Sequence, residues 1–270
     1  MEKLEHPLWI VQLVNALLGP AVAAALRPFG FTFKPGQDVI PDFLVMSLVV
    51  LVGVAVLCVL IRSRLSVENP GKLQLLLEEA VSFLNGMLDD YIGPKGRNYL
   101  PIVGTMFIFI LIGNLMGLVP GLKSPTSNIN VTLGCALTVF VYYQFHGFKE
   151  QGVIGYLKHF LAPPGAPIWI FPIYLPVEII SHFSRVLSLS VRLFGNIFGE
   201  DLVIVIIASI VPFVLPLVMM PLALITAGLQ AYIFAMLTTI YLAGAVVVDH
   251  GPDGHDAQGG GHAAAEGHAA

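Results

Sequence analysis

Residues 178–196 read Glu178-Ile-Ile-Ser-His-Phe-Ser-Arg-Val-Leu-Ser-Leu-Ser-Val-Arg-Leu-Phe-Gly-Asn196, and this stretch decides the fold. Glu178, Arg185 and Arg192 follow one another at intervals of seven residues, so on an α-helix they lie along nearly one line. Arg192 lies about 21 Å along the axis from Glu178, at about 1.5 Å per residue. That is a large part of a bilayer core of about 30 Å. Ionisable side chains are unfavourable in a membrane, so this stripe predicts a functional site.

The composition predicts an all-α, polytopic membrane protein. The chain has 270 residues, of which 56% are hydrophobic and 11% charged, and its mean hydropathy is +0.84. Soluble domains usually carry about 25% charged residues. The thirteen Lys and Arg are scattered, which argues against a nucleic-acid-binding surface. Cys58 and Cys135 both lie in apolar runs and are expected to be packed thiols, without a disulfide or metal.

Three regions follow from the sequence. Residues 1–41 form an interfacial N-terminal segment, and residues 42–248 form a single membrane domain. Residues 249–270 are rich in His, Gly and Ala and are expected to be a disordered tail without metal-ligand spacing. No motif for nucleotide, dinucleotide or zinc binding and no nucleophile elbow occurs in a structural context that fits it. We therefore expect no catalytic residue, metal or cofactor.

Five spans are expected in the membrane domain, with the last preceded by a run of prolines. Pro212, Pro216 and Pro221 are expected to break residues 202–219 into short pieces. The expected spans are 43–61, 101–119, 131–145, 172–198 and 221–248.

A surface helix is expected between the first two spans, over residues 70–92. Its apolar residues recur at intervals of three and four, and it carries four acids, so we expect it to lie along the membrane surface. Lys and Arg gather in loops 62–100 and 146–167. The positive-inside rule then places the N-terminus outside and the C-terminus in the cytoplasm of a bacterium with this chain in its inner membrane.

Arg192 keeps its charge under biological conditions, so it cannot carry a proton by releasing one. It can hold a fixed positive field and pair transiently with a carboxylate brought beside it. The structural alternatives are an ion pair with Glu178 or Asp201, or snorkelling to an interface. Asp201 lies about 13 Å away along a helix, which argues against direct pairing.

Glu178 is either an interfacial anchor or a proton-exchanging carboxylate. Arg185, nearer the expected cytoplasmic end, either snorkels or shares the function. His182 either shares the hydration of Glu178 or is a satisfied core histidine. At the other end, Glu200 and Asp201 either cap the next helix or form an aqueous mouth that takes up cations.

Small residues recur along the helix and permit close approach of another helix; they are Ser181, Ser184, Ser188, Gly195 and Gly199. The final helix supplies Thr226, Gln230 and Tyr241. Gln230 is the only amide in its span and needs a polar partner, for which Arg192 is the candidate.

Four motifs occur in one order along the chain: Asn114-Leu-Met-Gly-Leu-Val-Pro120, Pro125-Thr-Ser-Asn-Ile-Asn-Val-Thr-Leu133, Ser190-Val-Arg-Leu-Phe-Gly-Asn196 and Leu229-Gln-Ala-Tyr-Ile-Phe-Ala-Met-Leu-Thr-Thr-Ile-Tyr-Leu242. Together they resemble subunit a of the F-type ATP synthases, over residues 40–248. The resemblance implies a non-catalytic stator subunit in the lipid bilayer, with two long helices against a ring of c subunits and contacts with the b-subunit stalk and the rest of the complex.

The resemblance also implies roles for single residues. Arg192 faces the ring carboxylate and separates two half-channels for protons, with Na⁺ the less favoured ion. Asn196 and Gln230 flank the arginine. Glu178 belongs to the cytoplasmic exit, and Glu200 or Asp201 belongs to the outer entrance.

The chain departs from the family at the outer entrance. Many members carry a His or Glu seven residues before the glutamine, where this chain has Ala223. The outer relay is therefore expected to use Glu200 and Asp201 with water. The alternatives to this function are a secondary cation transporter with a midplane site of arginine and acids, and a structural scaffold that leaves the Arg192 stripe unexplained.

Overall fold

The computed structural model describes residues 9–26, 39–62, 65–66, 70–119, 121–152, 171–210 and 214–246. Within these ranges the chain is all helical and has no strand, which confirms the expected fold class. In chain order the helices are α1 (Trp9–Leu26), α2 (Asp42–Arg62), α3 (Lys72–Ile92), the 3₁₀-helix η2 (Pro94–Tyr99), α4 (Leu100–Met116), the 3₁₀-helix η3 (Pro125–Ser127), α5 (Ile129–Gln151), α7 (Phe171–Ile210) and α8 (Val214–Val246).

Three of the described segments are long and apolar enough to cross a membrane: Asp42–Arg62, Pro94–Met116 and Met219–Val246. They correspond to the first, second and last expected spans. The other two expected spans lie in α5 and α7, which are helices of 23 and 40 residues. The predicted surface helix is α3, which begins at Lys72 and ends at Ile92.

The prediction that Pro216 and Pro221 break residues 202–219 into short pieces is wrong, and Pro212 lies outside the described residues. α7 continues from Phe171 to Ile210, and α8 begins at Val214. Pro216 falls in the first turn of α8, where a proline loses no intrahelical hydrogen bond. Pro221 lies inside α8 and is tolerated there. With 40 residues, α7 is about 60 Å long, about twice the thickness of a bilayer core, so it must be strongly inclined in the membrane.

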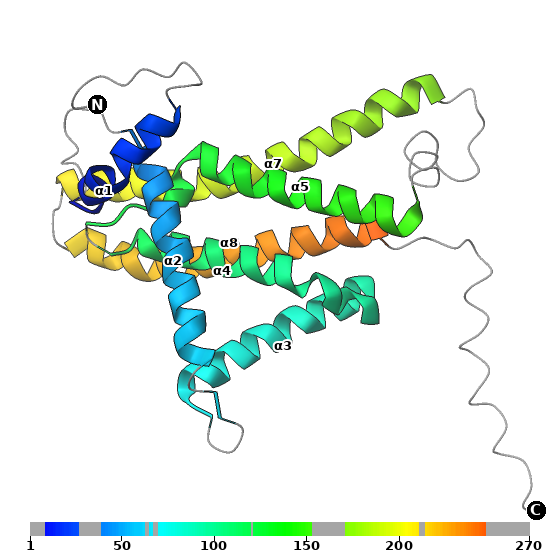
Figure 1. Ribbon diagram of the computed structural model, residues 1–270, viewed down its shortest axis with the longest axis horizontal. Helices are drawn as coiled ribbons and strands as arrows, with labels where there is room; N and C mark the ends of the chain where they lie inside the picture. Colours follow the sequence, from blue (N-terminus) through cyan, green and yellow to red (C-terminus); the bar gives the residue numbers. More distant parts are fainter. Residues whose placement is uncertain are drawn as a thin grey trace, which may run out of the picture.

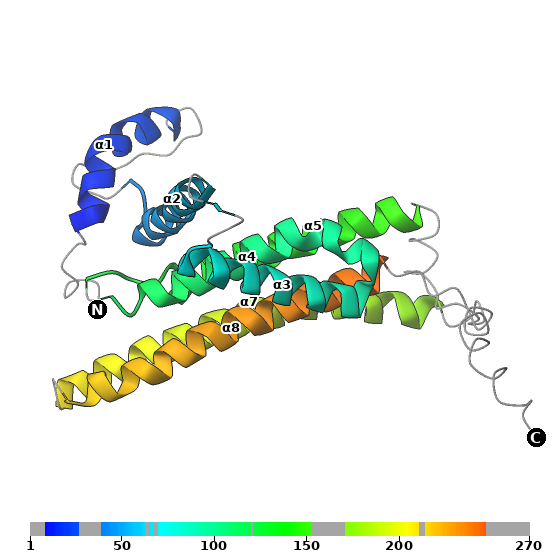
Figure 2. The same ribbon diagram turned by 90° about the horizontal axis from the view of Figure 1, so that it is seen from below.

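α8 is the central helix of the molecule and contacts α3, α4, α5 and α7. It runs antiparallel to α7, and the two lie side by side at the end where the chain passes between them (Figure 1, Figure 2). Towards the other end α7 and α8 diverge, and α5 packs against both of them (Figure 1).

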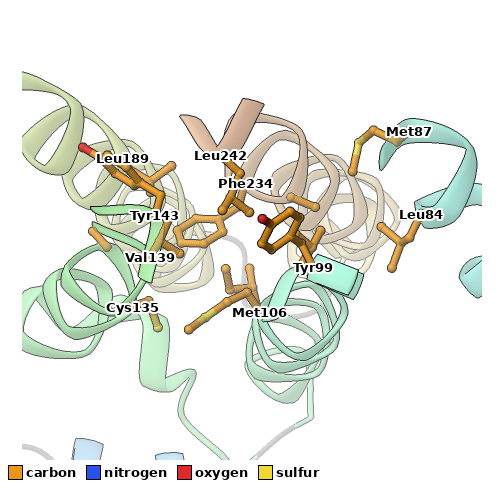
Figure 3. Packing of buried hydrophobic residues seen from close by; sticks show 14 of the residues in the cluster. Leu84, Met87, Tyr99, Met106, Cys135, Val139, Tyr143, Leu189, Phe234 and Leu242 are labelled. Atoms are coloured by element: carbon orange, nitrogen blue, oxygen red, sulfur yellow. The ribbon is translucent and has the colours of Figure 1, made fainter. Parts of the chain in front are cut away.

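One apolar core joins these helices (Figure 3). Tyr143 of α5, Phe234 and Leu242 of α8 and Leu193 of α7 are each at most 1% exposed. Figure 3 shows Tyr143 and Phe234 in this core together with Met106 of α4. Full burial of large side chains on three facing helices fixes how these helices pack.

A smaller cluster attaches α1 to the membrane domain. Val11 of α1 packs with Met46 of α2 and Met116 of α4. The amide of Asn15 donates to the carbonyl of Ile40 at 3.0 Å and accepts from its N–H at 2.9 Å. The described part of the N-terminal segment is therefore tied to the bundle by both apolar contacts and hydrogen bonds.

The expectation that both cysteines are packed thiols is met only in part. Cys135 is a buried free thiol, but Cys58 is exposed because α2 packs against the bundle through only one of its faces. Leu84, Met87 and Leu88 of α3 join the core. The tail 249–270 and most of loop 146–167 lie outside the described residues.

Arg97 of η2 fastens the turn after α3 by an ion pair with Asp89 at 2.7 Å. This hydrogen-bonded partner lowers the pKa of Asp89 below its ordinary value. Gly96 lies in the same turn, directly against α3, where a Cβ atom would meet the carbonyl oxygen of Leu88 at 2.5 Å and the Cβ of Ile92 at 3.2 Å.

We predict that Gly96→Ala destabilises this corner by about 1–3 kcal/mol, because the backbone must shift to admit the methyl group. Gly86→Ala is the matched control, since a Cβ there meets nothing within 4 Å. The measurement is maleimide labelling of the buried Cys135 during heating, in a Cys58→Ser background. Equal labelling temperatures for the two variants would contradict the close approach at Gly96.

Candidate functional site: a divided polar path along α7

Arg192 lies on an exposed and largely apolar face of α7. The residue is exposed, and within the described residues its guanidinium forms no hydrogen bond or ion pair. One helical turn away begins an open groove of about 460 Å³, whose walls include Phe183, Leu187 and Val191. The structural alternative for Arg192, an ion pair with Glu178 or Asp201, is therefore not formed in this chain.

Small residues continue this face past the arginine. Ser184 and Ser188 line the same groove. A Cβ added at Gly195 or Gly199 would meet nothing within 4 Å. The backbone of α7 is thus open to close approach from outside on both sides of Arg192.

An amide pair lies one turn beyond Arg192. The amide nitrogen of Asn196 donates to the side-chain oxygen of Gln230 at 2.8 Å. Gln230 is 2% exposed, so it needs this partner. The prediction that Arg192 is the partner of Gln230 is wrong, because the side-chain oxygen of Gln230 accepts from Asn196 and the exposed arginine forms no hydrogen bond among the described residues. Ser190, on the buried face of α7, shares a 3.1 Å hydrogen bond with Thr132 of α5.

Glu178 begins a chain of hydrogen bonds into the core. Its carboxylate lies 3.3 Å from Nε2 of His182, and Nδ1 of His182 lies 2.9 Å from the hydroxyl of Tyr143. A carboxylate only accepts, so a neutral His182 donates its Nε2–H to Glu178. Its Nδ1 then accepts the Tyr143 hydroxyl proton, which fixes the tautomer. Glu178 stays 20% exposed, so it contacts both this chain and the surroundings.

His182 therefore combines the two alternatives considered for it: it is a buried, hydrogen-bonded histidine, and it pairs with Glu178. Tyr174, one turn before Glu178, adds a further side-chain hydrogen bond to that carboxyl. Ser181 is half-buried on the same part of α7.

Arg185 packs over the ring of Tyr241, with its guanidinium carbon 5.5 Å from the ring centre. A cation over an aromatic face is favourable, and more so away from water. The Tyr241 ring in turn lies 6.1 Å from that of Tyr143. Arg185 is thus held against α8 and shares a neighbour with the Glu178 chain.

The two acids at the other end of the stripe share one small cavity. Glu200 and Asp201 are half-buried and line a space of about 20 Å³, which is enough for one water molecule. Ala223 and Asn114 line the same space from α8 and α4. Because Ala223 leaves no polar side chain on α8 there, the two acids, Asn114 and the neighbouring loop supply the polar groups.

Lys123 is the cation nearest in sequence to this cavity. It pairs with Asp42 at 3.5 Å and also exerts an attractive field on Asp201. Ser127 of η3 contributes a side-chain interaction to Asp201. The loop between α4 and α5 therefore forms one wall of the acid site.

Among the described residues, no three His, Cys, Asp or Glu side chains come together as a metal site. The structure does bring together other residues that the sequence reasoning did not select. Tyr143 was treated only as part of an apolar span, and Asn114 only as part of a motif. Both were detectable as polar groups within apolar runs, and Asn114 is the single amide of α4.

Comparison with known proteins agrees with this arrangement. The family model of the ATP synthase A chain matches residues 43–243. The ATP synthase subunit a of Koribacter versatilis is 36% identical over 245 residues, 91% of this chain and 99% of its own length. That of Sulfurihydrogenibium sp. is 40% identical over 75% of this chain and 95% of its own length. ATP synthase subunit a 1 of Syntrophotalea carbinolica is 42% identical over 76% of this chain and 84% of its own.

The matched region includes α2 to α5, α7 and nearly all of α8, and with them Arg192, its neighbours Asn196 and Gln230, and the acids Glu178, Glu200 and Asp201. Identities of 36% to 42% over most of both chains are much higher than a shared helical fold alone would give. The chain therefore belongs to the ATP synthase A chain family.

Proposed function

We propose that Arg192 is the charge barrier between two proton half-channels, through which this chain acts as the proton-translocating stator beside the c-ring of a rotary ATP synthase. The chain itself is a non-catalytic component of that complex. In the proposed path, the acids at Glu200 and Asp201 take up protons from the outer side, and Glu178 releases them towards the cytoplasm.

One observation carries this proposal: Arg192 is charged, exposed and unpaired among the described residues, on a face that is otherwise apolar or small. A guanidinium in hydrocarbon requires a negative partner. Because no described residue supplies one to Arg192, we infer that the partner comes from outside, and the open face around Gly195 fits a helix that slides past it. A carboxylate on each passing c subunit meets this need.

The positions of the acids support a divided path. α7 is continuous from Phe171 to Ile210, so axial distances along it are reliable. Glu178 lies about 21 Å from Arg192 in one direction, and Asp201 about 13 Å in the other. The two acid groups therefore cannot exchange a proton directly. A proton entering at one must ride on the ring carboxylate to reach the other.

The chemistry of both ends favours protons over Na⁺. The Glu178 end combines a carboxylate with an imidazole and phenols, which exchange protons readily. A membrane potential contributes about 2.3 kcal/mol per charge per 100 mV, and a direct leak would dissipate it without rotation. A fixed positive charge between the two ends blocks such a leak. With Glu178 on the cytoplasmic side, the C-terminus is also cytoplasmic, and the membrane is the bacterial inner membrane.

We predict that Arg192→Ala abolishes ATP-driven proton pumping by the complete complex in inverted membrane vesicles. The ring carboxylate then loses the charge that makes it release its proton. Arg97→Ala is the control, because its ion pair with Asp89 is exposed and contributes little. Pumping by Arg192→Ala at the rate of the control would refute the proposed path.

For the outer end, we predict that Glu200→Gln combined with Asp201→Asn slows proton translocation more than either change alone. The two carboxyls share one cavity, so each can partly replace the other. The measurement is ATP synthesis by vesicles under an imposed proton gradient. If all three variants have the same rate, a shared relay is excluded.

For the inner end, we predict that Tyr143→Phe slows ATP-driven pumping about fivefold, the effect of losing one hydrogen bond of about 1 kcal/mol. Without the hydroxyl, the tautomer of His182 that donates to Glu178 is no longer fixed. Tyr142→Phe is the neighbouring control. The pumping rate of the Tyr143→Phe variant should also depend on the cytoplasmic pH in a different way from that of the unmodified protein. A purely structural defect would lower the rate equally at every pH.

A further inference from the structure

Two arginines leave α7 from nearly the same side but lie in different surroundings. Seven residues separate Arg185 from Arg192, so they are about 10 Å apart along the helix axis and nearly aligned around it. Arg192 is exposed, whereas Arg185 is half-buried. The proposed function uses one fixed charge, so the second arginine requires an explanation of its own.

Arg185 lines an internal space of the bundle and not the open face of α7. The described residues that line the open groove include its neighbours Ser184 and Ser188, but not Arg185. Arg185 instead lines a small space together with Val139 of α5 and Tyr241 of α8. This space has no room for a water molecule. The side chain of Arg185 is therefore directed into the bundle.

The ring of Tyr241 is the contact that holds Arg185 there. The guanidinium carbon lies 5.5 Å from the ring centre, within the distance of about 6 Å at which a cation is attracted to an aromatic face. Among the described residues Arg185 forms no ion pair. Glu178, the acid of the same stripe, is engaged by His182 at 3.3 Å. Arg185 is thus held by an aromatic face instead of an anion.

A second free guanidinium on this line would interfere with the proposed mechanism. A guanidinium and a carboxylate attract each other strongly where water is excluded. A ring carboxylate that reached a free Arg185 would pair with it and stop about 10 Å from Arg192. The path would then contain two stopping points in place of one charge barrier.

We propose that Tyr241 is a positioning residue that withdraws Arg185 from the path of the ring carboxylates, so that Arg192 is the arginine they meet. This inference deepens the proposed function, because it rests on Arg192 facing the c-ring. It gives Arg185 no part in proton transfer itself. Tyr143 supports the arrangement, since its ring centre lies 6.1 Å from that of Tyr241.

The test is ATP-driven proton pumping by the complete complex in inverted vesicles. We expect Tyr241→Leu to lower the pumping rate about tenfold, the effect of losing a cation–π contact away from water, because Arg185 can then pair with the ring carboxylates. Tyr241→Phe keeps the aromatic face and should pump within about twofold of the unmodified complex. Tyr241→Leu combined with Arg185→Leu should pump about fivefold faster than Tyr241→Leu alone, because no second guanidinium remains.

A packing role of Tyr241 predicts a different order of rates. Removing first the ring and then the arginine from the same internal space would enlarge the cavity, so the double variant would be slower than Tyr241→Leu. A double variant that pumps no faster than Tyr241→Leu therefore overturns the proposal. Arg185→Leu alone being as inactive as Arg192→Ala would also overturn it, since Arg185 would then take part directly.

Tyr232→Leu is the matched control on α8. Tyr232 packs against Phe83 of α3, with ring centres 5.7 Å apart, and no described arginine lies over its ring. Adding Arg185→Leu to Tyr232→Leu should bring no gain in rate, and an equal gain there would contradict the specific role of Tyr241. Co-purification with the c-ring checks assembly. If Tyr241→Leu does not assemble, Tyr241→Met replaces it, because its flexible side chain adapts to the gap without an aromatic face.

The charge barrier and the role of Tyr241 are tested separately. If Arg192→Ala complexes still pump, the charge barrier itself fails. If they do not pump, while Arg185→Leu brings no relief to Tyr241→Leu, only the role of Tyr241 fails.

Discussion

A guanidinium group keeps its positive charge at every biological pH, and in a membrane it must be matched by a negative one. Arg192 is matched by no described residue of its own chain, and its surroundings on α7 are apolar or small. The molecule is therefore incomplete at this point. In the proposed function, the continuity of α7 and the open face around Arg192 leave this one charge accessible to a partner that passes.

The two ends of the path are built from different hydrogen-bond chemistry. At one end Tyr143 fixes His182 so that an N–H is directed at Glu178. At the other end the hydroxyls of Thr126 and Ser124 form a hydrogen-bonded chain with Asn114, which lines the cavity of the acids. In both cases the orienting hydroxyl belongs to a different segment from the acid it serves.

Much of the fold was predictable from the sequence because hydrophobic length and periodicity are local properties. The apolar run of α2, the three-and-four spacing of α3 and the all-α class follow from them directly. The start of α8 did not, because Pro216 and Pro221 indicate breaks, whereas both lie within the continuous helix α8. Whether a proline ends a helix depends on whether its position and neighbours satisfy the freed carbonyls, and tertiary contacts decide that.

The sequence by itself determined that Glu178 and Arg192 lie on one helix at a fixed axial distance, since helical rise is constant. The continuation of this helix through Glu200 and Asp201 was decided by the structure. It also determined the family, through four motifs in order. Only the tertiary structure decided which groups these residues touch: Gln230 bonds Asn196 and leaves Arg192 open, His182 reaches Tyr143, and Asn114 faces the acids. These partners lie 34 residues or more away in the chain, and side-chain pairing at that separation is set by how helices cross, which no local pattern encodes.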